Sequence, residues 1–205
     1  MLWSIRIIIF LLHREYVNWP EWHLKIYEVN QRAKLGAKYY VWMTVGPFYA
    51  MMTLPCIYRL QAVSKNGIRS IWSFSIILGV ALQVVGLILE TVADYQKSNF
   101  KSRSPENRYN WCNEGLWGFS TNPNYFGELL FWTGTYIGGF GSYETIGQWI
   151  LTTVGFIFIA TVLKDACDTI GAKHLRNYGQ NIQFMEFRRT HNILGPFPKR
   201  SGTFL

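Results

Sequence analysis

Three long apolar runs without a charged residue constrain this chain more than any other feature. They cover residues 40–58, 70–89 and 145–163, and are 19, 20 and 19 residues long. A helix that crosses a membrane needs about 20 apolar residues, because each residue adds about 1.5 Å along the helix axis. A fourth apolar block, 125–141, is shorter and carries Glu128 in its first turn. The runs therefore predict an integral membrane protein.

We predict an all-α membrane helical bundle in which no β-strand crosses the bilayer, since helices satisfy their own backbone groups in lipid. A short N-terminal membrane helix is expected at 2–12, an apolar block that contains Arg6 and lacks the cleavage site of a signal peptide. A soluble fold would suit the mean hydropathy of +0.05, but it would have to bury three such runs in 205 residues. The whole chain, 1–205, is treated as one membrane domain. The four full transmembrane helices are expected near 40–61, 70–93, 125–141 and 145–164.

Basic residues are distributed unevenly over the connections between these runs. If each block crosses once, 16 of the 20 basic residues fall on the face that receives 13–39, 94–124 and 164–205. The positive-inside rule makes that face cytosolic or, in an organelle, the matrix side. Basic residues beside membrane spans also attract anionic headgroups, so membrane lipids are expected partners. This placement accounts for the net charge of +8 without nucleic acid, which we do not expect as a partner.

Cysteine and histidine indicate no metal centre. The three cysteines are an odd number and include no C-x-x-C pair, and no two of the four histidines have ligand spacing on one helix. We therefore predict neither a disulfide framework nor a zinc site.

The stretch in which a polar loop passes into the fourth apolar block is the strongest candidate site. Asn122 followed by Pro123 is typical of an N-cap with proline at the first helical position. Asn124 and Glu128 lie four residues apart and share one face of that helix, where an amide and a carboxylate can hold a ribose or a carboxamide. A helix N-terminus on the basic face also suits a phosphate group.

Two more carboxylates, Glu90 and Asp94, lie one helical turn apart at the end of the second run. Carboxylates near hydrocarbon are costly and usually serve a function. The alternative is that both lie at the interface, hydrated or paired with Lys97 and Lys101.

Several stretches in order resemble a known family. "ETVADYQKSNFKS", "GLWGFSTNPNYFGELLFWTG" and "FMEFRRTHNILGPFPK" together resemble the C-terminal domain of the steroid 5α-reductase family, in its branch of membrane reductase-like proteins. The upstream "LWSIRIIIFLLHREYVNWPEW" resembles the entry to that domain, so the resemblance covers nearly the whole chain. It implies that the C-terminal helices bind NADPH from the cytosolic side and that hydride passes to a conjugated carbon–carbon double bond. The isoprenylcysteine methyltransferases are similar in this half but use S-adenosylmethionine.

The resemblance implies six residues that line the cofactor, all of them on the basic face, and we assign no catalytic residue. Before "PNYFGE" the family typically has Ser-Arg-His, whereas this chain has Ser120, Thr121 and Asn122. A phosphate-gripping arginine and a histidine are thereby replaced. Family members also begin with additional spans that help to enclose a lipid-like substrate, and this chain is expected to start after them. The six residues are Asp94, Asn124, Tyr125, Glu128, His174 and Tyr178.

These departures lead us to expect a catalytically retired accessory subunit of a larger membrane protein complex, with a vestigial NADPH site. Other subunits of that complex are its expected protein partners. Two alternatives stay open: an active NADPH-dependent reductase of a lipid or steroid enone, and a membrane methyltransferase. The mitochondrial inner membrane is the favoured location, and the endoplasmic reticulum is the alternative.

Overall fold

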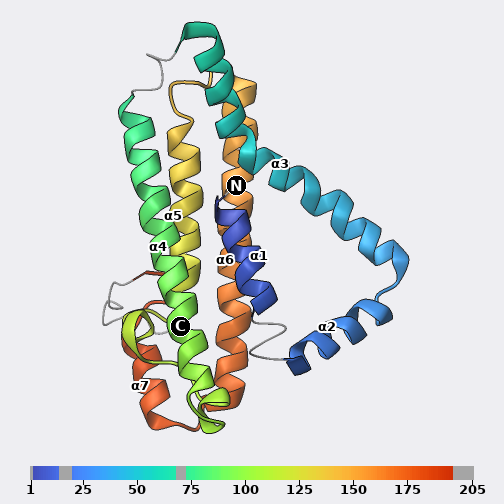
Figure 1. Cartoon of the computed structure of the whole chain (residues 1–205), viewed down its shortest axis with the longest axis vertical. Coiled ribbons are helices and arrows are strands. Elements are labelled where there is room, and N and C mark those ends of the chain that lie inside the picture. The colour runs from blue at the N-terminus through green and yellow to red at the C-terminus, as the bar shows by residue number, and fades with distance from the viewer. Residues whose placement is uncertain (1, 14–19, 68–72, 196–205) are drawn as a thin grey trace. The chain divides into compact units, whose positions relative to one another are not determined.

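The computed structural model describes residues 2–13, 20–67 and 73–195. The chain divides into two compact units, Met1–Pro47 and Phe48–Leu205. Within the described ranges the regular structure is helical and no β-strand occurs, as the sequence predicts (Figure 1).

The first unit contains α1 (Leu2–His13), α2 (Pro20–Arg32) and the start of α3 (Leu35–Asn66). Helix α1 confirms the short apolar helix expected at 2–12. Helix α2 lies in the segment 13–39, which the sequence predicts as a connection. It begins with a proline, whose fixed φ suits a first helical turn, and Glu28 and Arg32 pair across one turn at 3.7 Å.

The second unit is built around three long helices that stand side by side in Figure 1, coloured green, yellow and orange. The later part of α3 belongs to this unit, and a short helix follows the third long one. The elements are α4 (Phe74–Ser102), η3 (Glu106–Arg108), η4 (Gly115–Gly118), α5 (Pro123–Gly138), α6 (Ile146–Tyr178) and α7 (Ile182–Thr190).

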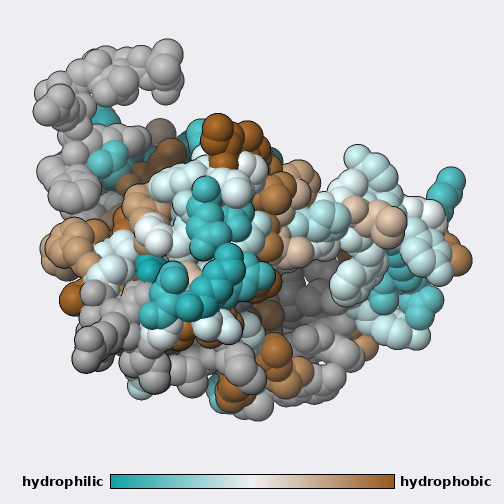
Figure 2. Space-filling model, turned by 90° about the horizontal axis from the view of Figure 1, so that it is seen from above, coloured by the Kyte–Doolittle hydropathy of each residue, from teal (hydrophilic) through white to brown (hydrophobic). Residues whose placement is uncertain are grey.

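Two helices, α4 and α6, are long and apolar enough to cross a membrane. Their apolar stretches expose side chains such as Ile77, Ile88 and Ile157, as expected of a surface that meets lipid. In the view from above, a group of hydrophilic residues is visible with hydrophobic residues beside it (Figure 2). Helix α3 contains the expected block 40–61, and α5 has 16 residues, or about 24 Å. In the described part of the chain, α4 and α6 alone meet both criteria for a span.

Facing glycines bring α4 and α5 into close contact. Gly79 of α4 lies against Gly134 and Gly138 of α5, and Gly86 lies against Gly127. Small residues allow helix backbones to approach each other closely, which is how membrane helices gain packing energy. The pair therefore forms a tight antiparallel hairpin.

Aromatic stacking joins α6 to its neighbours. The rings of Tyr136 on α5 and Phe156 on α6 stack with their centroids 5.0 Å apart, and the Tyr136 hydroxyl lies 2.8 Å from Thr153 Oγ1. On α3, Phe48 stacks on Phe158 at 4.1 Å. These contacts fix α6 beside both helices within the second unit.

An arginine closes the C-terminal end of α5. Arg59 Nη2 donates hydrogen bonds to the carbonyl oxygen of Gly138 at 2.8 Å and to Ser75 Oγ at 3.1 Å, and it also reaches the Phe140 carbonyl. The last carbonyls of a helix lack intrahelical donors and carry partial negative charge, so a guanidinium there satisfies and stabilises them.

Candidate functional site

A cavity of about 180 Å³ lies near the N-terminal end of α5, at the opposite end of that helix from Arg59. Its walls come from α4, the connection that leads to α5, α6, α7 and the residues that follow α7. It lies beyond the apolar stretches of the long helices. Lys97 and Lys101 come after the run 70–89 on α4, and the α6 residues that line the cavity follow Leu163.

Three cationic side chains line this cavity. Lys97 Nζ lies 4.3 Å from the centroid of the Trp117 ring, a cation–π contact. Lys101 Nζ donates to the backbone carbonyls of Arg108 and Asn110, and burial lowers the pKa of Lys101. Arg188 Nη1 donates to the carbonyl oxygen of Gly171 at 2.8 Å. Each cation is thus held in place by the fold.

One carboxylate is found among the described residues that line the cavity, Asp168, and its Oδ2 accepts a hydrogen bond from Lys164 Nζ at 2.8 Å. Both side chains of this pair, one turn apart on α6, are exposed to solvent. Three cationic side chains and one carboxylate give the described lining a net positive charge, which favours an anionic ligand.

Aromatic rings form much of the rest of the wall. Phe184 of α7 is buried, and its ring lies 5.4 Å from that of Trp111 and 5.5 Å from that of Tyr178. Trp117 is also buried, and its Nε1 donates to the Ala93 carbonyl at 2.8 Å. Phe187 packs 4.9 Å from Trp111. Cations and flat rings that line one cavity are typical of sites for anions that carry an aromatic group.

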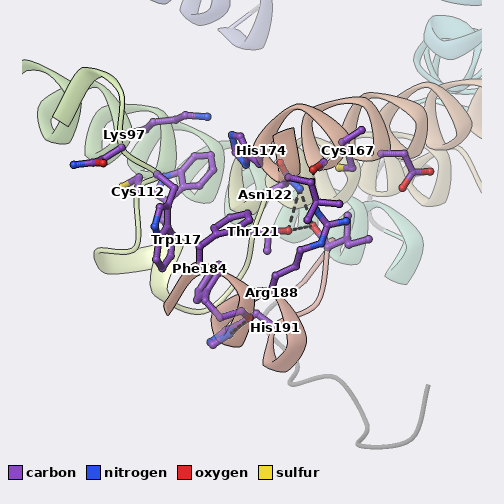
Figure 3. A pocket seen from close by; sticks show the side chains of 18 of the residues that line it. Lys97, Cys112, Trp117, Thr121, Asn122, Cys167, His174, Phe184, Arg188 and His191 are labelled. Carbon is purple, nitrogen blue, oxygen red and sulfur yellow. Dashed lines mark hydrogen bonds between the residues drawn. The ribbon is translucent and has the colours of Figure 1, made fainter. Parts of the chain in front are cut away.

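His174 of α6 is half-buried and lies among the lining residues labelled in Figure 3, and its ring lies near those of Tyr178 and Phe184. Burial is the main cause that lowers the pKa of His174 to about 4. The positive charges of Lys97, Lys101, Lys173 and Arg188 lower it further. The imidazole is therefore neutral at physiological pH.

The segment after α7 is fastened to the start of α5. The backbone N–H of Thr121 donates to the Asn192 carbonyl at 3.2 Å, and Thr121 Oγ1 donates to the Ile193 carbonyl at 3.3 Å. Asn122 Nδ2 donates to the same Ile193 carbonyl at 3.2 Å, and dashed lines in Figure 3 mark hydrogen bonds at Thr121 and Asn122. Thr121 and Asn122 both line the cavity, so the bonds also hold its wall.

The N-cap expected at Asn122 is correct in position and wrong in its hydrogen bond. Helix α5 does begin at Pro123, but the described structure shows no cap hydrogen bond from the Asn122 side chain. The Asn122 amide donates to the Ile193 carbonyl instead, and Ile193 follows Asn122 by 71 residues in the sequence.

The six residues implied by the resemblance lie on helices that border the cavity, and one of them, His174, lines it. Tyr178 follows one turn later, with its ring centroid 5.6 Å from that of His174. Asp94 lies one turn before Lys97 on α4. Asp94, Tyr125 and Glu128 are half-buried and each takes part in an interaction of the fold. Asn124, Tyr125 and Glu128 occupy the first two turns of α5, next to the lining residues Thr121 and Asn122.

The buried amide oxygen of Asn124 accepts no hydrogen bond from any described residue. That these six residues hold a cofactor stays a prediction.

Sequence reasoning missed the cationic side chains that line the cavity. The sequence suggests Lys97 and Lys101 only as possible partners of Glu90 and Asp94, although their spacing places both lysines on one face of α4. Arg188 gave no local signal, because its role depends on how α7 folds back toward Gly171. Among the described residues, no group of three His, Cys, Asp or Glu side chains is arranged to hold a metal ion.

Comparison with known proteins gives one family. A family model described as "Protein of unknown function (DUF1295)" matches residues 1–191, which include every helix from α1 to α7. No curated protein and no solved structure matches the chain. The chain therefore belongs to the DUF1295 family.

Proposed function

We propose that this chain is a membrane-embedded accessory subunit of the 5α-reductase type, whose cavity holds a phosphate-bearing part of NADPH. It binds the cofactor without reducing a lipid enone by itself. Membership of DUF1295 is compatible with the resemblance on which this proposal draws.

The observation that carries the proposal is the convergence of Lys97, Lys101 and Arg188 on one cavity lined by aromatic rings. The phosphates of NADPH supply the anionic partner, and its nicotinamide and adenine supply flat rings. Whole small-molecule sites usually measure about 300–1,000 Å³. A cavity of about 180 Å³ therefore suits one end of the dinucleotide, with the rest lying along the surface.

The membrane arrangement proposed for this subunit has four spans. Helices α4 and α6 supply the two with sufficient length and hydropathy. The glycine contacts hold α5 against α4, so α5 is proposed to share the same depth, and α3 supplies the fourth span through its block 40–61. In this arrangement the cavity faces the basic side, where the cytosol or matrix provides nucleotides and anionic lipids surround the bundle.

The accessory role is supported by Thr121 and Asn122, which stand where the resembling family typically has arginine and histidine. Their side chains donate to the carbonyl oxygens of residues that follow α7. Those donors are thus engaged in holding the fold rather than directed at a phosphate or a substrate carbonyl. Reduction of an enone requires a donor that polarises its carbonyl as well as a hydride source.

The test is cofactor binding by the full chain in nanodiscs of neutral lipid. We expect NADPH to bind with micromolar affinity by calorimetry, and NADH and S-adenosylmethionine to bind more weakly. Arg188→Gln should weaken NADPH binding about 10- to 100-fold, because a hydrogen bond between charged groups contributes about 1.5–3 kcal/mol. Arg189→Gln is the matched control, since Arg189 is the next residue on α7 but its side chain is exposed and does not line the cavity.

Three other outcomes of this experiment would contradict the proposed function. NADPH oxidation with an enone lipid by the chain alone would replace the accessory role with an active reductase. Preferential binding of S-adenosylmethionine would favour the methyltransferase. Failure of all three ligands to bind, with the variants folded, would overturn the proposal.

A further inference from the structure

His174 is a neutral base that lines the cavity together with its cations, and its position suggests more than a lining role. Its ring packs against Tyr178 and Phe184, so it is held in place by α6 and α7 together. Lys97 and Lys101 face the same space from α4, and Arg188 faces it from α7. The imidazole therefore experiences positive charge from two sides of the cavity.

The other titratable groups around His174 contribute little negative charge. Lys173 precedes it on α6, and Asp168 is engaged by Lys164 at 2.8 Å. The Cys112 and Cys167 thiols are buried, which raises the pKa of each, so both are neutral. His191 lines the cavity from the segment after α7. Without a ligand, the surroundings thus oppose a charge on His174.

We infer, resting on the proposed nucleotide site, that the group held between Lys97, Lys101 and Arg188 is a doubly charged phosphate, and that its binding is coupled to the uptake of one proton by His174. A dianion offsets two of the neighbouring positive charges, and it accepts a hydrogen bond best from a charged donor. Its arrival therefore reverses the preference of the imidazole from neutral to protonated. His174 becomes the fourth cation of the cavity, but in the occupied state alone.

The direction of the pH effect follows from this coupling. The free protein keeps His174 neutral above its lowered pKa of about 4, while the occupied site favours the ring's protonated form up to a higher pH. Between these two limits the complex holds one more proton than its parts, so acidification strengthens binding by up to about tenfold per pH unit. At higher pH the gain disappears.

The probe must keep its charge while the protein titrates. A phosphate monoester protonates with a second pKa of about 6, which would mask the effect, whereas sulfate stays a dianion throughout the range. We would label histidine rings with ¹³C, place the full chain in neutral nanodiscs, and follow the titration of His174 by NMR with and without sulfate. His174→Gln assigns the signal. If His174→Gln does not fold, the signal can be assigned with a chain in which His13, His23 and His191 are replaced by Gln, because His174 is then its one histidine.

We expect saturating sulfate to raise the midpoint of the His174 titration by at least about one pH unit. Arg188→Gln should abolish the rise and Arg189→Gln should retain it. If NADPH and sulfate bind while the midpoint does not move, the coupling is wrong and the nucleotide site stands. If neither ligand binds to folded protein, the proposed function falls together with this inference.

Discussion

A Cβ atom placed on Gly86 of α4 would lie 2.5 Å from the backbone carbonyl oxygen of Gly127 on α5. Ordinary side-chain carbons do not approach backbone atoms so closely, and the atoms it would meet cannot rotate away. The contact between the two helices thus depends on the absence of a side chain at this position.

Gly86→Ala should therefore destabilise the second unit by about 1–3 kcal/mol, since the α4–α5 hairpin must open to admit the methyl group. The measurement is unfolding of the purified chain in mild detergent, by heat or by titration with SDS. Gly46→Ala is the control, because nothing lies within 4 Å of its Cβ position and alanine favours the helix there. Equal stability of Gly86→Ala and the wild type would show that the hairpin is looser than described.

Arg59→Met should also destabilise the chain, by about 1–3 kcal/mol, because the carbonyls of Gly138 and Phe140 lose their donor at the end of α5. Lys65→Met tests a second cation on α3 that pairs with Glu144 at 3.0 Å on the exposed surface. Exposed ion pairs contribute about 0–1 kcal/mol, so this control should change little. The same unfolding assay compares them, and equal losses would contradict a special role for Arg59.

Asn122→Ala should loosen the segment that follows α7, because the Ile193 carbonyl loses a donor. The net contribution of such a bond is about 1 kcal/mol, or about a fivefold change in the population of the open form. Limited trypsin digestion should cut after Arg189 correspondingly faster. Asn113→Ala, at an exposed position in the connection before α5, should leave the cleavage rate unchanged.

The folded chain should lose stability as the pH falls from about 6.5 to 4. The folded state holds the pKa of His174 at about 4, against an ordinary value of 6.5, so the unfolded chain binds more protons in this window. Stability therefore rises with pH across it. After allowance for partial solvent screening we expect an effect of about 1–2 kcal/mol. Comparison of unfolding at pH 7 and pH 5 should show this loss in the wild type and a smaller loss in His174→Gln.

The helical fold could be predicted from the sequence because hydrophobic length is a local property. The apolar runs placed α4 and α6 correctly, yet both helices continue well beyond the runs. Hydropathy marks the part of a helix that suits lipid, and residues such as Lys, Glu and Ala extend the helix into water without altering its backbone. Helix α7 was missed because it is short and gains its stability from packing, with Phe184 buried against Trp111.

The candidate site was less predictable, since its parts come from distant segments. His174 was implied by the family resemblance, whereas Arg188 could not be assigned because its position on α7 depends on a contact with Gly171 of α6. The role of Asn122 was expected from its neighbour Pro123 alone. Its actual partner, Ile193, belongs to a segment whose path no local pattern describes.

The bonds from Thr121 and Asn122 to Asn192 and Ile193 also set an order of events during synthesis. Chains emerge from the ribosome N-terminus first, so α4, α5 and α6 are available before α7 exists. Phe184, Arg188 and His191 are among the last residues of the described chain to be made, and each forms part of the cavity wall. A nascent chain that ends before α7 thus lacks part of the cavity wall. A ligand that needs the whole of this wall could therefore bind only after translation has passed Ile193.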